Sequence, residues 1–197
     1  MKKLLLAVAM SAQLTTQLFA GGDIAPVEVH EPEVMAHEAE SKFYVIAKVL
    51  MVMGDKESHG HATLEGDRDY GYGFDIGYRL GHGFALEYDF SYASNTVTED
   101  DGHTTHEAKA KYYTHAFDLV YTYEFTHTFG VFVKGGYEYE FEEIDDLHID
   151  DEKDGFNYGV GVEVALDHTY KLLAEYEWST IDCPRGDGLF VGVMYNF

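Results

Sequence analysis

Large apolar side chains recur at every second position from Phe43 to the last residue, which is the period of a β-strand with one apolar face. Between positions 70 and 80, for example, Tyr, Phe, Ile and Leu alternate with Gly, Asp and Arg. The same alternation defines eight segments, at about 43–53, 70–80, 84–92, 113–125, 131–141, 156–166, 170–178 and 188–197. The pattern therefore predicts an all-β fold of eight strands.

The lengths of the segments and of their connections narrow the architecture. Segments of roughly 9 to 13 residues are long enough to cross a bilayer when tilted. Short turns at 81–83, 126–128 and 167–169 alternate with long polar connections at about 54–69, 94–111, 142–155 and 180–187. This alternation is typical of barrels with tight periplasmic turns and long outer loops. We therefore expect an eight-stranded antiparallel up-and-down transmembrane β-barrel over residues 43–197.

The direction of the apolar face separates two kinds of barrel. A soluble barrel of the lipocalin type points its apolar face inward around a ligand, whereas a membrane barrel points it outward into lipid. Here the polar face carries Gly, Ala, Ser and single charges, and the bulky aromatic residues of the other face would overfill an eight-stranded interior. The aromatic residues also gather near both strand ends, as two girdles at the lipid headgroups would require. The membrane barrel is the favoured interpretation.

The N-terminal region predicts export. Residues 1–20 combine a positively charged start with a short apolar stretch, as in a secretory signal peptide. Residues 21–42 are acidic and lack an apolar period, so we expect a mostly disordered periplasmic leader. The single Cys183 excludes an intramolecular disulfide. A formal net charge of -23 makes nucleic acid an unfavourable partner.

The charged residues of the polar face predict ion pairs beside the three short turns. If these turns are centred on positions 82, 128 and 168, each places one acid and one base on diagonal cross-strand positions within reach of long side chains. The expected pairs are Arg79 with Glu87, Glu124 with Lys134, and Glu163 with Lys171. Acids outnumber bases on this face, so we expect the remaining carboxylates in water near the outer mouth.

Two segments, KFYVIAKV at the first strand and LFVGVMYNF at the C-terminus, resemble the small outer-membrane β-barrel family of Gram-negative bacteria. This family includes outer membrane protein X and the membrane domain of outer membrane protein A. The resemblance covers about residues 43–197 and implies a monomer in the outer membrane, in contact with lipid and lipopolysaccharide. It also implies insertion by the barrel assembly machinery, which in this family reads a C-terminal pattern matched here by Leu189, Val191, Val193, Tyr195 and Phe197.

Several functions fit such a barrel. We expect a structural or surface-interaction protein that presents acidic extracellular loops; the alternative is a narrow cation-preferring channel, or a barrel that binds a small ligand or a metal. An eight-stranded barrel leaves no channel of porin size. Ser91 and Ser179 face the interior and His115 the lipid, so we predict no catalytic arrangement, no enzyme activity and no cofactor.

Histidines in two of the long connections are the candidate metal ligands. His59 and His61 precede Glu65, and His103 and His106 follow two aspartates. Imidazole and carboxylate groups are common ligands of transition metals. The more ordinary interpretation is solvated loops with scattered histidines. A milder hypothesis is that divalent cations bridge loop carboxylates to lipopolysaccharide phosphates.

Overall fold

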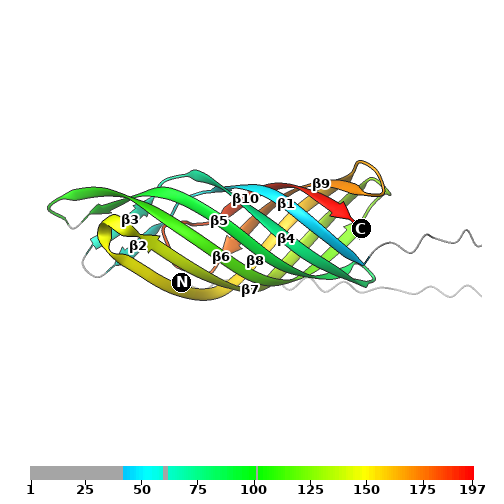
Figure 1. Cartoon of the computed structure of the whole chain (residues 1–197), viewed down its shortest axis with the longest axis horizontal. Helices are drawn as coiled ribbons and strands as arrows, with labels where there is room; N and C mark the ends of the chain where they lie inside the picture. Colours follow the sequence, from blue (N-terminus) through cyan, green and yellow to red (C-terminus); the bar gives the residue numbers. More distant parts are fainter. Residues whose placement is uncertain (1–41, 60–61, 101) are drawn as a thin grey trace, which may run out of the picture. The chain divides into compact units, whose positions relative to one another are not determined.

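The computed structural model describes residues 42–59, 62–100 and 102–197. The predicted signal peptide (1–20) and all of the predicted leader (21–42) except its last residue lie outside the described residues. Within the described part, no helix is long and apolar enough to cross a membrane. The elements are β1 (Phe43–Val52), β2 (Lys56–His59), β3 (Ala62–Gly66), β4 (Asp69–Gly81), β5 (Phe84–Asp100), β6 (Thr105–Glu124), β7 (Phe129–Ile144), the 3-10 turn η1 (Asp145–Leu147), β8 (Ile149–Ala165), β9 (Tyr170–Ser179) and β10 (Gly188–Asn196) (Figure 1).

Eight of the strands pair in a closed antiparallel ring. From β4 to β10 each strand pairs with the next in sequence, and β1 pairs with both β4 and β10. The closing register places Val45 opposite Tyr195 and Met51 opposite Leu189. The predicted eight-stranded antiparallel barrel is therefore confirmed. The remaining strands, β2 and β3, form a hairpin that joins the sheet through pairing of β3 with the end of β5.

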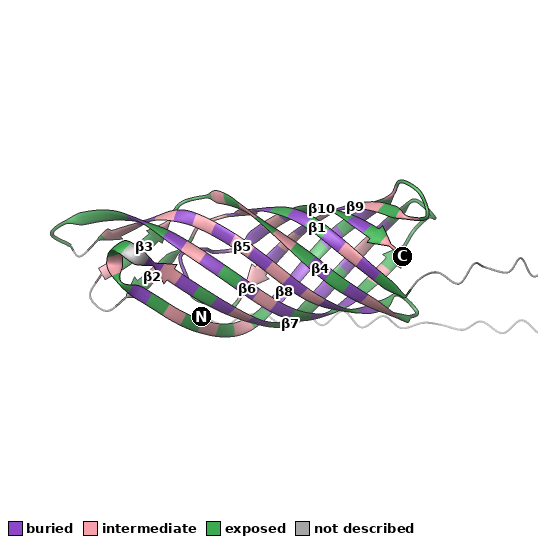
Figure 2. Cartoon of the chain, in the orientation of Figure 1, coloured by how far each residue is buried: buried purple, intermediate pink, exposed green. Residues whose placement is uncertain are grey.

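Burial alternates along the barrel strands, as Figure 2 shows by its purple and green bands. Outward-facing rings are well exposed, with Tyr70 at 71 % and Phe117 at 69 % of their full accessibility. Inward-facing Lys48 and Asp75 are buried at 4 % and 2 %. Because the bulky rings lie outside and the charges inside, the orientation is that of a membrane barrel, as the sequence predicts.

Aromatic residues on the outer face form contacts near both ends of the strands. Towards the long connections, Tyr92 lies with ring centroids 5.3 Å from Tyr72 and 5.1 Å from Tyr113. Towards the short turns, the ring pairs are Phe84–Tyr121 at 4.9 Å and Tyr170–Tyr195 at 5.4 Å. These positions match the two predicted girdles.

Three of the expected loops are mostly sheet, which corrects the sequence-based prediction: the connection at 54–69 contains β2 and β3, and two others are strand extensions. β5 continues to Asp100 and β6 begins at Thr105, while η1 and one further residue separate β7 from β8. Near and beyond the outer aromatic positions the inward side chains are mostly small or aliphatic, with two aromatic rings among them. They form a buried cluster: Leu50, Val52, Leu64, Ala93, Val97, Ala108, Ala110, Tyr112, Ile144, Ile149 and Phe190. Alanine, threonine and acidic residues give a weaker alternation than aromatic residues, and the strand extensions were therefore missed.

Candidate functional site

Two buried lysines form ion pairs with the carboxylates in the middle of the lumen. Lys48 pairs with Asp75, at 2.7 Å between Nζ and Oδ1, and with Asp89. Lys134 Nζ contacts four carboxylates, at 3.2 Å from Asp89, 3.7 Å from Asp118, 2.8 Å from Glu175 and 2.6 Å from Glu177. Strand alternation places all of these side chains on the inner face of the barrel. There the buried charges need each other as partners.

Lys171 lies near both Glu163 and Glu124. Its Nζ is 2.7 Å from Glu163 Oε1, the pairing expected from the sequence, and 3.2 Å from Glu124 Oε1. Glu124 was expected to pair with Lys134, but the β6–β7 register places Glu124 opposite Gly130 and Lys134 opposite Val120. The turn is centred one residue earlier than expected, with Phe125 and Thr126 both donating backbone hydrogen bonds to the Phe129 carbonyl. The shift places Lys134 among the buried carboxylates in the middle of the lumen. These carboxylates, with Lys48 and Lys134, are called the central cluster.

Tyr44 lies between Arg79 and Glu87, the remaining expected pair. The register places Arg79 opposite Ala85 and Glu87 opposite Gly77, which is the expected diagonal arrangement. The Tyr44 hydroxyl donates a 2.6 Å hydrogen bond to Glu87 Oε1, and the Arg79 guanidinium carbon lies 4.6 Å from the centroid of the Tyr44 ring. Arg79 also donates to Asn196 Oδ1 at 2.5 Å. The tyrosine therefore contacts both members of the pair.

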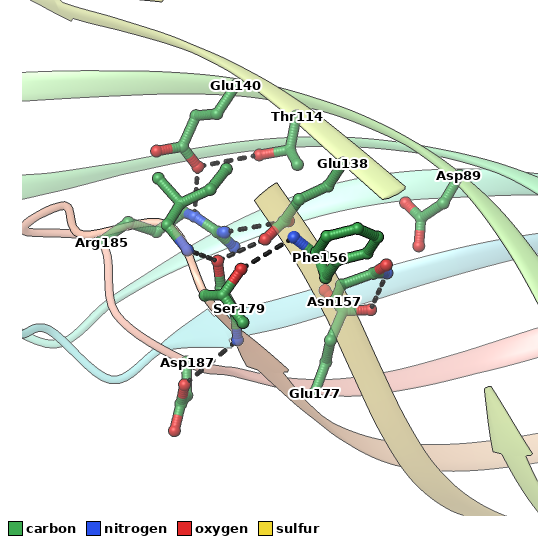
Figure 3. Close-up of polar contacts among 12 residues, drawn as sticks. Asp89, Thr114, Glu138, Glu140, Phe156, Asn157, Glu177, Ser179, Arg185 and Asp187 are labelled. Atoms are coloured by element: carbon green, nitrogen blue, oxygen red, sulfur yellow. Dashed lines mark hydrogen bonds and ion pairs between the residues drawn. The ribbon is translucent and has the colours of Figure 1, made fainter. Parts of the chain in front are cut away.

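The connection between β9 and β10, residues 180–187, folds into the outer mouth of the barrel; we call it the plug. Arg185 is its central residue and is only 2 % exposed. Its Nε lies 2.5 Å from Glu140 Oε2, and its Nη2 donates to Glu138 Oε2 at 3.4 Å (Figure 3). Thr114 donates to Glu140 at 3.2 Å, and the Ser179 hydroxyl donates to Glu138. A guanidinium with two carboxylates thus fills the lumen at this level.

Backbone hydrogen bonds fix the plug to the β1–β2 connection. The N–H groups of residues 53, 54 and 55 donate to the carbonyls of residues 187, 185 and 184, at 2.9, 3.0 and 3.1 Å. Gly54 and Gly186 have φ angles of 71° and 68°, and a Cβ on Gly186 would lie 2.9 Å from the Gly54 carbonyl. Glycine is suited to both positions, because it tolerates positive φ and leaves room for the close approach.

Lys153 fixes the plug from the side of β8. Its Nζ donates to both carboxylate oxygens of Glu57 at 2.8 Å, to Glu142 at 3.0 Å and to the Asp182 carbonyl at 3.0 Å. Burial opposes the charge on Lys153, but its bonds to Glu57 and Glu142 outweigh burial and raise the pKa of this amine. One side chain therefore joins the β2–β3 hairpin, the barrel wall and the plug.

Arg185 and Lys153 were not expected at the site. The surplus carboxylates were expected in water, whereas Glu138, Glu140 and Glu142 are at most 2 % exposed and have cationic partners. These cations come from segments that were interpreted as outer loops. The signal was the excess of lumen acids itself, together with an arginine in the shortest outer connection, because buried carboxylates need nearby positive charge.

Apolar layers lie above and below the ion pairs. The outer layer is the buried cluster defined above, and the inner layer, near the short turns, consists of Tyr44, Ile46, Ala85, Val120, Phe132, Leu173 and Met194. A cavity of about 400 Å³ at the turn end reaches this inner layer, and a second one beside it holds about 20 Å³. The smaller volume has room for about one water molecule. In the described part of the chain, buried side chains occupy the middle and outer lumen.

We predict that Gly66→Ala displaces the plug. A Cβ on Gly66 would lie 2.0 Å from the Pro184 carbonyl oxygen, and such overpacking costs roughly 1–3 kcal/mol. Cys183 reports the displacement, because it is 2 % exposed and burial, followed by the nearby Glu140, raises the pKa of its thiol. We expect slow maleimide labelling of the native protein and faster labelling of the variant.

Gly135→Ala is the matched control, since the nearest atom to its added Cβ would be 3.7 Å away. Its labelling should equal that of the unaltered protein. Equal labelling of Gly66→Ala would show that this carbonyl does not hold the plug.

The five residues of the expected assembly pattern lie along the closing strand. Leu189, Val191, Val193 and Tyr195 stand opposite outward-facing residues of β1, and the Phe197 N–H donates to the Phe43 carbonyl at 3.4 Å. Phe197 is 65 % exposed on the lipid side. Their role as an assembly signal stays a prediction.

The candidate metal ligands lie in the outer extensions. His106 is on β6 and His103 is in the turn before it, whereas His61 and the side chain of His59 fall outside what the structure describes. Among the described side chains, no group of three or more His, Cys, Asp and Glu is arranged to hold a metal ion.

Known proteins resemble this chain in sequence pattern and in fold. The sequence profile described as "Outer membrane protein beta-barrel domain" matches residues 4–197. No curated protein matches the sequence. The outer membrane protein OprG from Pseudomonas aeruginosa superposes with a TM-score of 0.65 and 12 % identity, covering 80 % of this chain and 97 % of OprG. Neisserial surface protein A gives 0.57 and 18 %, covering 81 % and 100 %. At these identities the likeness to solved structures shows the fold.

Proposed function

Because this chain belongs to the outer membrane protein beta-barrel domain family, we propose that it has a structural or surface-interaction role in the outer membrane. The filled lumen carries this proposal. Arg185 with its two carboxylates, the lysine cluster and two apolar layers occupy the interior. Since side chains occupy the middle and outer interior, the extracellular surface is the part of the molecule best placed for specific contacts.

The extracellular extension offers such a surface. β5 to β8 continue beyond the outer aromatic positions around an apolar core, which supports a rigid sheet in place of mobile loops. Its solvent side carries several carboxylates, among them Glu107, Asp150, Glu152 and Asp154. A rigid acidic surface suits cationic partners and divalent cations that bridge to lipopolysaccharide phosphates.

We also propose how the chain is inserted into the membrane and what surrounds it there. Outer-membrane lipid contacts the exposed rings, and the barrel assembly machinery reads Phe197 and the alternate apolar residues before it. The β1–β10 pairing closes the ring of eight strands in its membrane part, which supports a monomer.

A narrow cation-preferring channel is the second candidate. The acidic lumen and the cavity at the turn end favour it, but an ion would have to cross both apolar layers. We therefore expect the refolded protein to show no discrete conductance in planar bilayers. Steady steps of cation-selective current would replace the structural role by the channel. A deletion strain with unchanged adhesion and detergent sensitivity would contradict the structural and surface role independently.

A further inference from the structure

Two strand edges are open at the extracellular end of the barrel. Pairing of β8 with β9 begins at Asn157 opposite Ser179, so residues 149–155 of β8 pair with β7 alone in the described part of the chain. β2 likewise pairs only with β3 among the described residues. Lys153 on β8 and Glu57 on β2 join these two strands through side chains, at 2.8 Å, and not through backbone pairing. The unpaired edge of β8 at residues 149–155, on the side of β2, is called the slot below.

Backbone alternation identifies the groups that face the slot. The Thr180 N–H donates to the Phe156 carbonyl at 2.9 Å, so the backbone of Phe156 points away from β7. In an antiparallel strand, N–H and C=O point to the same side at every second residue. Asp154, Glu152 and Asp150 therefore direct their backbone donors and acceptors to the slot. Unpaired edges of this kind are templates for another strand.

We propose that the slot binds an extended, basic peptide segment of a partner protein, which adds a strand beside β8. The proposal rests on the surface-interaction role and names the kind of partner. Strand addition uses main-chain hydrogen bonds for affinity and alternate side chains for specificity. The slot would thus recognise an extended conformation and a charge pattern.

The side chains beside the slot determine the charge of the segment. Asp150, Glu152 and Asp154 stand on the outward face of β8, and Tyr139 donates to Glu152 at 2.6 Å. Carboxylates on an open edge discourage pairing with acidic or neutral strands, while lysine or arginine at alternate positions neutralises them. The inward positions must be small, because the Lys153–Glu57 ion pair occupies the interior there.

The test uses the full mature chain refolded in lipid nanodiscs and a hexapeptide of alternating Lys and Val with blocked ends. We expect salt-sensitive binding that slows hydrogen exchange at the amides of Asp150, Glu152 and Asp154. The control peptides are the same sequence with N-methylated backbone at alternate residues and an alternating Glu and Val peptide. Neither control should protect these amides. Equal binding of the N-methylated peptide would reduce the interaction to charge attraction and overturn strand addition.

A protein variant tests the edge directly. Glu152→Pro removes an N–H that faces the slot and leaves the β7 ladder intact, and the loss of one hydrogen bond should weaken binding roughly tenfold. Glu152→Gln keeps the donor and removes the charge, so it should bind with a smaller loss and a weaker salt dependence. Heat-modifiable gel mobility verifies that both variants fold. Unchanged binding by the proline variant would place the peptide elsewhere and overturn the proposal.

The two proposals fail separately. Absence of peptide binding by a folded, non-conducting barrel would reject the slot and leave the surface role standing. A conducting barrel would reject the sealed structural role, whatever the peptide does.

Discussion

Arg185→Met is expected to release the plug and to destabilise the barrel by roughly 3–5 kcal/mol, the usual cost of removing one partner from a buried ion pair. Glu138 and Glu140 are both 0 % exposed, and Arg185 is the cation that the structure places beside them. Without Arg185, two buried carboxylates lie near each other with no compensating positive charge. Urea unfolding followed by gel mobility measures the stability, and maleimide labelling of Cys183 measures release of the plug.

A combined variant separates lost charge compensation from lost packing. Arg185→Met with Glu138→Gln and Glu140→Gln removes the cation and both anions while keeping similar volumes. We expect it to recover most of the stability, because neutral amides are easier to bury than carboxylates. If Arg185→Met alone unfolds at the same urea concentration as the unaltered protein, the plug is not held by these pairs.

Lys134→Met should have the second large effect. Four carboxylates share this one amine, and its side chain is only 1 % exposed. We expect a loss of roughly 3–5 kcal/mol at neutral pH, from the same cause as at Arg185. Lowering the pH should reduce the loss, because protonation neutralises the carboxylates. Urea unfolding at neutral and acidic pH measures both effects.

Lys171→Met is the control for Lys134→Met. Lys171 also pairs with two carboxylates, and the Glu163 side chain is 6 % exposed, but Lys171 itself is 18 % exposed and Glu124 60 %. Water reaches the amine and one of its partners, so we expect a smaller loss than in Lys134→Met. Equal losses of unfolding free energy in the two variants would mean that the central cluster stabilises the barrel no more than the Lys171 pairs do.

Local patterns explain why most of the fold was predictable. Strands with aromatic residues on one face, such as β4 and β6, have an unmistakable two-residue period. The turns at positions 82 and 168 were also placed correctly: Gly81 and Gly83 flank the first with positive φ, and the Asp167 side chain accepts backbone hydrogen bonds in the other. The turn near 128 is capped in the same way, by the Thr126 hydroxyl, which accepts backbone hydrogen bonds from residues 128 and 129. Threonine is a weaker turn signal than Gly or Asp, and the register of this turn was predicted one residue off.

The plug was not predictable from such patterns. Its position depends on contacts between residues far apart in sequence, such as Arg185 with Glu138 and Lys153 with Glu57. Sequence periodicity reports which face of a strand is apolar, but not whether a polar connection folds back into the barrel. The surplus of lumen carboxylates, together with an arginine in the shortest outer connection, was the signal that pointed to missing cations.

Unequal strand lengths determine from which side a binding partner can reach the extracellular mouth of the barrel. β6 has 20 residues and β5 has 17, whereas β9 and β10 have 10 and 9. The sheet of β5 to β8 therefore extends far beyond the membrane on one flank, whereas β9 and β10 end close to it on the other. A partner that approaches parallel to the cell surface would meet the tall sheet on one flank, and would reach the mouth of the barrel more easily over β9 and β10.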